Sequence, residues 1–144
     1  MKKIVLGLVV CALVLAIPLS ATAGNGPYNK VTGDMWFTNG AYGWANFTFS
    51  GHDVGLPADD KGTAYYADSA GYWYGTATSV LVGPTTGTMY VTVTFSTHPA
   101  VLVGSQHVFG FYDQGEPGTA DYFTYGGAGH YAAEAGNIQL HYYG

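Results

Sequence analysis

A strict alternation of apolar and polar residues is the feature that most constrains the fold. In residues 89–95, tyrosine and threonine alternate with four apolar residues, Met89, Val91, Val93 and Phe95. Because successive side chains of a β-strand point to opposite faces, this segment predicts a strand with one face in a core and the other toward water. Runs of this kind centre on residues 31–38, 43–50, 62–67, 72–82, 88–96, 105–112, 120–125 and 137–143.

These runs predict an all-β protein, with one antiparallel domain over residues 24–144. Tyrosine, valine, threonine and glycine are abundant, while runs typical of helices are missing after the first 23 residues. With sequential strands pairing, we expect an up-and-down β-barrel or sandwich of about eight strands. Closure into a barrel is attractive because it removes exposed sheet edges, which a chain with so few charges guards poorly.

The register of the first hairpin is constrained by the faces of its strands. A two-residue loop at Asn39-Gly40 would place Phe47 on the face opposite Met35, which would split the core between two faces. A loop of three or five residues avoids this conflict. We therefore expect Met35 to pair with Ala45 on the core side.

Residues 1–23 have the pattern of a secretory signal peptide. Lys2 and Lys3 form a positive start, residues 4–19 are mostly apolar, and Ala21-Thr22-Ala23 offers small residues before Gly24. The apolar run is shorter than the roughly 20 residues that a membrane-spanning helix needs. We expect a signal-peptide helix that is cleaved after Ala23 and a secreted protein, either extracellular or periplasmic.

Removal of this leader changes the chemistry open to the protein. Two lysines then remain against nine acidic residues, a net charge of about −7, and neither cysteine nor arginine is left. Nucleic acid is excluded as a partner, because binding to phosphates needs clustered lysine and arginine. Disulfide and thiol chemistry are excluded as well. The mature chain is not expected to be embedded in a membrane.

One loop has the composition of a cation site. Asp113, Glu116 and Asp121 alternate with glycine, and carboxylate oxygens on a curling backbone suit calcium. The spacing differs from that of an EF-hand. The competing interpretation, which we favour, is that these carboxylates accept hydrogen bonds from backbone amides of a tight loop. The five histidines lack the local spacing of zinc ligands, so calcium is the only cofactor that the sequence indicates.

Surplus aromatic residues form a second candidate site. Tyrosine and tryptophan on an outer face or in a barrel mouth can stack on sugar rings or on flat apolar ligands. The same residues also stabilise a sheet as cross-strand pairs; the turn signal at residues 68–71, for example, predicts Tyr66 opposite Trp73. The candidate ligand-binding residues are Trp36, Trp44, Tyr65, Tyr66, Trp73, Tyr74 and Tyr90.

Three stretches resemble a known group of proteins. They are Val31 to Phe37, the D-x-G-E-P-G pattern that begins at Asp113, and Gly136-Asn137-Ile138-Gln139-Leu140-His141. They resemble a broadly distributed set of small secreted prokaryotic β-proteins, which includes modules called post-COAP domains. The resemblance implies an exported all-β module, sometimes attached to larger surface proteins. It implies no catalytic residues.

Together these patterns predict a secreted, non-enzymatic β-domain that serves as a binding or cell-surface structural module. Its expected partner is a glycan, a small apolar ligand or a cell-surface protein. Carbohydrate or apolar ligand binding through an aromatic face or barrel mouth is the first alternative. A small outer-membrane β-barrel is the second. The third is a small-barrel enzyme with dispersed catalytic residues, such as Asp34 or Glu134 with a histidine.

Overall fold

The structure is a computed structural model that describes residues 28–116, 118–127 and 129–144. The predicted signal peptide lies outside these residues. The described part is all-β, and its elements are β1 (Asn29–Asn39), β2 (Gly43–Asp53), β3 (Lys61–Asp68), β4 (Gly71–Val82), β5 (Thr86–Ser96), β6 (Gln106–Tyr112), the 3-10 helix η1 (Gly118–Ala120), β7 (Tyr122–Tyr125), β8 (Gly129–Ala132) and β9 (Ala135–His141). None of the described residues belongs to a helix long and apolar enough to cross a membrane.

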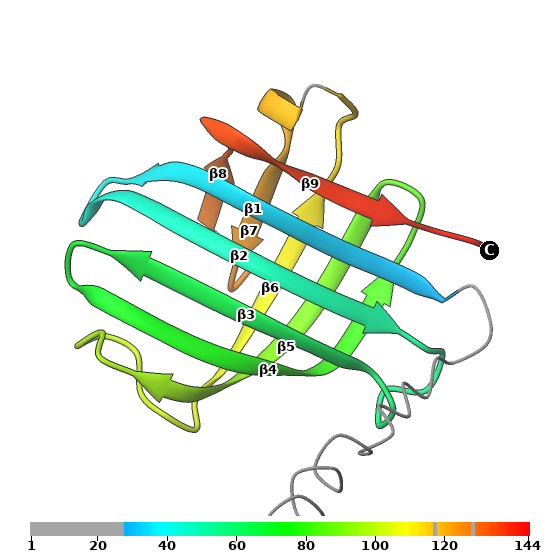
Figure 1. Ribbon diagram of the computed structural model, residues 1–144, viewed down its shortest axis with the longest axis horizontal. Helices are drawn as coiled ribbons and strands as arrows, with labels where there is room; N and C mark the ends of the chain where they lie inside the picture. The colour runs from blue at the N-terminus through cyan, green and yellow to red at the C-terminus, as the bar shows by residue number, and fades with distance from the viewer. Residues whose placement is uncertain (1–27, 117, 128) are drawn as a thin grey trace, which may run out of the picture.

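All nine described strands pair antiparallel in one sheet, which curls into a half-barrel (Figure 1). Strands β1 to β8 follow one another as an up-and-down meander, as predicted, and β9 returns to pair with β1. Only Ala133 and Glu134 separate β8 from β9, and both strands run in the same direction. Segment 129–141 therefore pairs first with β7 and then with β1, and so it links the two edges of the sheet.

The sequence at the start of β9 suits this change of partner. Gly136 has a φ of 96°, a conformation that favours glycine, and a Cβ at this position would lie 1.9 Å from the carbonyl oxygen of Asp34 on β1. Only a residue without a side chain allows the two backbones to approach this closely. Glycine at this position thus permits the chain to pass from one sheet edge to the other.

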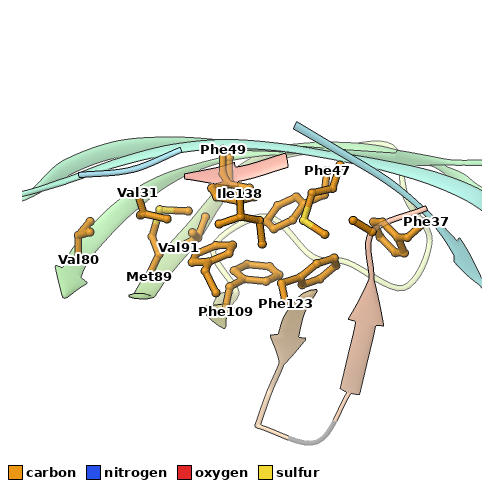
Figure 2. Close-up of a cluster of buried hydrophobic side chains, with 14 of the residues drawn as sticks. Val31, Phe37, Phe47, Phe49, Val80, Met89, Val91, Phe109, Phe123 and Ile138 are labelled. Carbon is orange, nitrogen blue, oxygen red and sulfur yellow. The ribbon is translucent and has the colours of Figure 1, made fainter. Parts of the chain in front are cut away.

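The core fills the concave side of the sheet. Figure 2 shows aromatic side chains of β2 facing those of β6 and β7 across the interior. The rings of Phe49 and Phe111 stack with centroids 4.0 Å apart, and those of Phe47 and Phe109 lie 4.7 Å apart. Because β2 and β6 are not neighbours in the sheet, these contacts hold the two walls of the half-barrel together.

The first hairpin keeps the predicted faces but not the predicted partners. Its loop has three residues, 40–42, and Asn39 pairs with Gly43. Met35 consequently pairs with Phe47, two residues from the predicted partner Ala45. Because side-chain direction repeats every two residues, a shift of two leaves the core side chains on the same face. The second hairpin pairs Tyr66 with Trp73, as predicted.

Strand β5 departs from the predicted alternation at its end. Met89, Val91 and Val93 are buried, but Phe95 is 46% exposed. The pairing of β4 with β5 shifts between Tyr74 and Gly75, so that Thr94 is an extra residue on β5. Such a bulge reverses the faces of the residues that follow it. The prediction that Phe95 belongs to the core was therefore wrong.

Candidate functional site

A pocket opens at the end of the half-barrel where β1 finishes. Its volume is about 330 Å³. It is lined by the inward faces of β1, β3, β4, β6, β7 and β8 and by the loops between β1 and β2 and between β5 and β6. Its wall is mainly apolar and aromatic, and its principal rings are those of Phe37, Tyr42, Tyr66, Trp73, Tyr125 and Tyr131. This set of side chains is hereafter called the aromatic pocket.

Strand alternation places a row of rings along one side of the aromatic pocket. Trp73 lies between Tyr66 and His107, with ring centroids 5.9 Å away on each side and planes within 16° of parallel. His107 in turn stacks with Tyr125 at 5.4 Å. These four residues come from four different strands, so the surface that they form depends on the curl of the sheet.

A buried carboxylate lies directly behind this wall. The Tyr66 hydroxyl donates to Asp68 Oδ2 at 2.7 Å, and His98 Nε2 lies 3.2 Å from the same oxygen. The other oxygen accepts the backbone amides of Ala70 and Gly71 at 2.8 and 3.2 Å. The Asp68 side chain is fully buried, and that of His98 is almost fully buried. Four donors thus converge on one carboxylate.

The hydrogen bonds of His98 indicate which of its two ring nitrogens carries the proton. The backbone amide of Ala100 donates to His98 Nδ1 at 3.2 Å, so Nδ1 is an acceptor and the proton resides on Nε2. His98 is then a neutral imidazole that donates to Asp68. Burial opposes ionisation of Asp68, but the hydrogen bonds from Tyr66 and Ala70 outweigh it and lower the pKa of the carboxyl below its ordinary value.

The pKa of Tyr66 is shifted in the opposite direction to that of Asp68. Burial raises the pKa of Tyr66 far above its ordinary value, and the hydrogen bond to the Asp68 carboxylate raises it further. Tyr66 therefore keeps its proton. That proton is held by Asp68, while the phenol oxygen accepts from Asn39 Nδ2 at 3.0 Å.

A second hydrogen-bonded chain lies on the other side of the aromatic pocket. The Ser105 hydroxyl donates to the carbonyl of Leu102 and therefore accepts from His107 Nε2 at 2.8 Å. His107 Nδ1 then accepts from the hydroxyl of Tyr125. Burial lowers the pKa of His107 and raises that of Tyr125, the latter helped by Tyr131. The third partner of this serine and histidine is a neutral phenol, where a hydrolase triad has a carboxylate.

The predicted aromatic residues fall into separate groups. Tyr66 and Trp73 line the aromatic pocket. Trp36 and Trp44 lie on the outer face of β1 and β2 and are 46% and 59% exposed. Tyr90 lies on the outer face of β5, half-buried. The structure thus brings together two of the seven candidates in one cavity and leaves both outer tryptophans away from it.

The remaining two candidates, Tyr65 and Tyr74, belong to an outer aromatic cluster with Tyr72 and Phe95. The rings of Tyr65 and Tyr74 lie 4.9 Å apart, and Tyr72 lies 5.8 Å from Tyr74. Phe95, turned outward by the bulge in β5, completes the cluster 5.7 Å from Tyr72. The cluster occupies the convex face of β3, β4 and β5, opposite the core.

The predicted calcium ligands are engaged with the protein itself. Asp121 is fully buried and accepts the backbone amides of Gln114 at 2.7 Å and Ile138 at 2.8 Å. Asp113 accepts the amide of Leu140 at 3.2 Å. These contacts match the amide-capping role that we favoured for the loop. Within the described residues, no group of three or more histidine or acidic side chains is arranged to hold a metal ion.

The third predicted ligand also faces a protein partner. Glu116 Oε1 accepts from the side-chain amide of Asn137, at the start of β9. The amides of Ile138 and Leu140 point away from β1, so the acidic loop covers the free edge of β9. The carboxylates take the place that a neighbouring strand would occupy.

A second acidic segment, residues 53–60, binds free backbone amides near the C-terminal end of β4. Asp60 accepts the amides of Val80 at 2.7 Å and Val54 at 3.1 Å, and Asp53 accepts that of Val82 at 3.1 Å. The pairing of β3 with β4 ends at Thr76, so these amides have no strand partner. Asp60 is buried, whereas residues 54–59, which precede it, are exposed.

The acidic residues considered for an enzyme lie elsewhere. Asp34 is on the outer face, where it accepts from Asn46 and Thr48 at 2.8 Å each. Glu134 accepts the backbone amide of Thr38 at 2.8 Å. Neither is bonded to a histidine in the described part of the chain.

Sequence reasoning missed His98 and His107, the two polar rings of the pocket wall. His107 had a signal, because it precedes Phe109 and Phe111 at alternate positions and so shares their inward face. His98 lies in the loop after β5, and no periodic pattern indicates where it points. Comparisons with protein-family models, with curated protein sequences and with solved structures gave no match.

Proposed function

We propose that this protein is a secreted, non-enzymatic binding module that holds a small, largely apolar ligand in the aromatic pocket. The observation that supports this proposal is the pocket itself. A concave, aromatic-lined site with a few fixed polar groups is the usual form of a small-molecule site, and about 330 Å³ is at the small end of their range. The ligand is therefore about the size of one or two rings.

The polar groups favour binding over catalysis. The hydroxyl proton of Tyr66 is held by Asp68, and that of Tyr125 is held by His107. His98 and His107 have both ring nitrogens engaged with the protein. A general acid or base needs a proton or a lone pair free to reach the substrate. These side chains instead form a rigid, prearranged wall, which reduces the entropy lost when a ligand is bound.

Tryptophan fluorescence provides a direct test. The chain has three tryptophans, and the two outer ones can be replaced together, as Trp36→Phe with Trp44→Phe. Trp73 then reports from the pocket wall alone. We expect saturable quenching or a spectral shift when this variant is titrated with a panel of one- and two-ring compounds. If no compound in the panel changes the emission at millimolar concentration, the proposal fails.

A matched pair of variants in one loop locates the binding. Val101 lines the pocket, whereas Val103, two residues away, is 61% exposed and is not part of the lining. Val101→Phe should fill the cavity and weaken binding at least tenfold, while Val103→Phe should leave the affinity unchanged. Equal effects of the two substitutions would place the ligand outside the pocket.

The outer aromatic cluster supports a second candidate function, glycan binding on the convex face. Tyr74 and Phe95 are about half exposed, and exposed rings can stack on sugars. Tyr74→Ala should abolish retention on an insoluble polysaccharide if this function is real. Tyr90→Ala, on the same face of the sheet, is the control. Retention unaffected by Tyr74→Ala would exclude the cluster as the binding surface.

Secretion is the part of the proposal that depends on the leader. The positive start, the apolar run and the small residues before Gly24 support it, as does the resemblance to small secreted β-proteins. Expression in a bacterial host should yield exported protein with Gly24 at its N-terminus, measured by intact mass. An uncleaved chain would contradict this part and leave the pocket proposal unaffected.

A further inference from the structure

We propose that the ligand of the aromatic pocket is a small organic ammonium ion whose alkyl groups lie against the rings. This inference rests on the proposed function and names the class of ligand. Three independent features of the described residues support it: the charge behind the pocket wall, the placement of the lysines, and the direction of the hydrogen bonds at the wall.

The charge behind the wall is negative and uncompensated by its nearest neighbour. Asp68 accepts four hydrogen bonds, from Tyr66, His98 and the amides of Ala70 and Gly71, as an ionised carboxylate does. His98 is neutral because its Nδ1 is occupied as an acceptor. The pair therefore retains one negative charge, a single side chain away from the cavity. In a buried setting that charge is weakly screened and acts on a ligand in the pocket.

The lysines of the described part lie at the opposite end of the half-barrel. Lys30 is the second residue of β1 and Lys61 is the first of β3, and both pair with His52 near the end of β2. The pocket is bordered by the other ends of these strands, at Asn39 and Tyr66. The sequence contains no arginine. The electrostatic field at the pocket is thus set by Asp68 and attracts a cation.

Two of the phenols in the wall do not donate to a ligand. The protons of Tyr66 and Tyr125 are directed at Asp68 and His107, so neither hydroxyl has a proton left for a ligand. No lysine or arginine is among the described residues that line the pocket, so an anionic ligand would find no positively charged side chain there. An ammonium ion would find negative potential and aromatic rings, the combination that recognises alkylammonium ligands.

The test compares two ligands of the same shape and different charge. Choline and its neutral carbon analogue, 3,3-dimethylbutan-1-ol, are titrated into the variant in which Trp73 is the sole tryptophan, and binding is confirmed by calorimetry. We expect choline to bind at least about tenfold more tightly. Equal affinities, tighter binding of the neutral analogue, or no binding of either would overturn the ammonium inference. Binding of other small apolar compounds would still support the proposed function in each of those cases.

The origin of the preference is tested by removing the charge. Asp68→Asn should lower the affinity for choline to that of the neutral analogue while the affinity for the analogue stays the same. Asp59→Asn, in an exposed loop, is the matched control and should change neither affinity. Circular dichroism verifies that both variants fold. A folded Asp68→Asn protein that keeps the preference would overturn the role of this carboxylate, and if that variant does not fold, the choice between choline and its analogue in the parent protein decides.

Discussion

Buried aspartates serve different purposes at the two ends of this half-barrel. At the pocket end, Asp68 is held by the side chains of Tyr66 and His98, both of which line the cavity. At the other end, Asp121 is held by the amides of Gln114 and Ile138, which belong to a loop and a strand edge. The partners distinguish the two cases. Both carboxylates accept hydrogen bonds from two backbone amides, but only Asp68 also accepts from side chains that line a cavity, so only Asp68 places its charge beside that cavity.

The comparison also shows how an open sheet protects its edges. Free amides at a strand edge invite pairing with another chain, and a buried amide without a partner is costly. Here the edge amides of Ile138 and Leu140 on β9, and of Val80 and Val82 on β4, are bound by carboxylates from short loops. Loops of this kind can replace a strand that the sheet lacks.

The largest effect should come from the strand-edge aspartate of β9. Asp121→Ala leaves two amides without an acceptor, one of them buried, and should lower the free energy of unfolding by about 3 kcal/mol. Urea denaturation measures this. Asp59→Ala, at an exposed position, should cost less than about 0.5 kcal/mol. Equal losses in the two variants would remove the distinction between capping and solvated carboxylates.

A somewhat smaller loss is expected from the corresponding residue at β4. Asp60→Ala removes the acceptor of the Val80 amide, which is buried, and of the Val54 amide, which is partly exposed. Asp60 is 8% exposed, whereas Asp121 is fully buried, so water can reach the site left at Asp60 more easily and we expect a loss of about 2 kcal/mol in the same denaturation experiment. In the double variant Asp121→Ala with Asp60→Ala, the two losses of unfolding free energy should be nearly additive, because the two loops bind different strands. Strong coupling would mean that the loops form one unit.

At the pocket end, removal of one hydroxyl should lower the stability less than the two aspartate substitutions do, but it should weaken ligand binding. Tyr66→Phe removes one donor from Asp68 and the acceptor of Asn39, and we expect a loss of about 1 kcal/mol in unfolding free energy. Ligand affinity, read from Trp73 fluorescence, should fall as well, whereas Asp121→Ala should leave the affinity of the folded protein unchanged. A Tyr66→Phe protein with unchanged affinity would show that the pocket wall does not depend on this network.

The smallest effect concerns pH. Burial lowers the pKa of His107 from 6.5, so its neutral form is favoured by folding, and stability should begin to fall as the pH drops below 6.5 and the unfolded chain takes up the proton. Asp68, whose pKa is lowered from 3.8, adds a second loss below that pH. Melting temperatures between pH 8 and pH 3 measure both. Burial also lowers the pKa of His52, which adds to the first step, so His107→Gln should reduce that step without removing it, whereas His141→Gln, at an exposed position, should leave it unchanged. An unchanged profile in His107→Gln would contradict this assignment.

The fold was predictable because alternation reports burial directly. The predicted runs match β1 to β7 and β9 to within a few residues at each end. The strand that was missed, β8, has four residues and begins at a glycine, so it is too short to show a period. The exposure of Phe95 was unpredictable for a different reason. An extra residue in a strand does not change the apolar pattern of the sequence, but it reverses the face to which the following side chains point.

The site was much less predictable than the fold. Residue type identified Tyr66 and Trp73 correctly as pocket residues, but the same reasoning included Trp36 and Trp44, which face solvent. The direction of a side chain relative to a cavity depends on how the sheet curls, and the curl depends on contacts between distant strands. His98 reaches the pocket from a loop, where no periodicity exists.

The pairing of β1 with β9 has a consequence for how the protein folds. It joins residues 99 to 111 positions apart along the chain, from Trp36 with Ala135 to Lys30 with His141. Contacts of such long range form slowly, because a large loop has to close before the contact stabilises anything. Until β9 arrives, β1 has one unpaired edge and Ile138 is missing from the core. The sheet therefore reaches its final form only after its last strand has been synthesised, and a chain that stops before β9 would display the open edge of β1 to its neighbours.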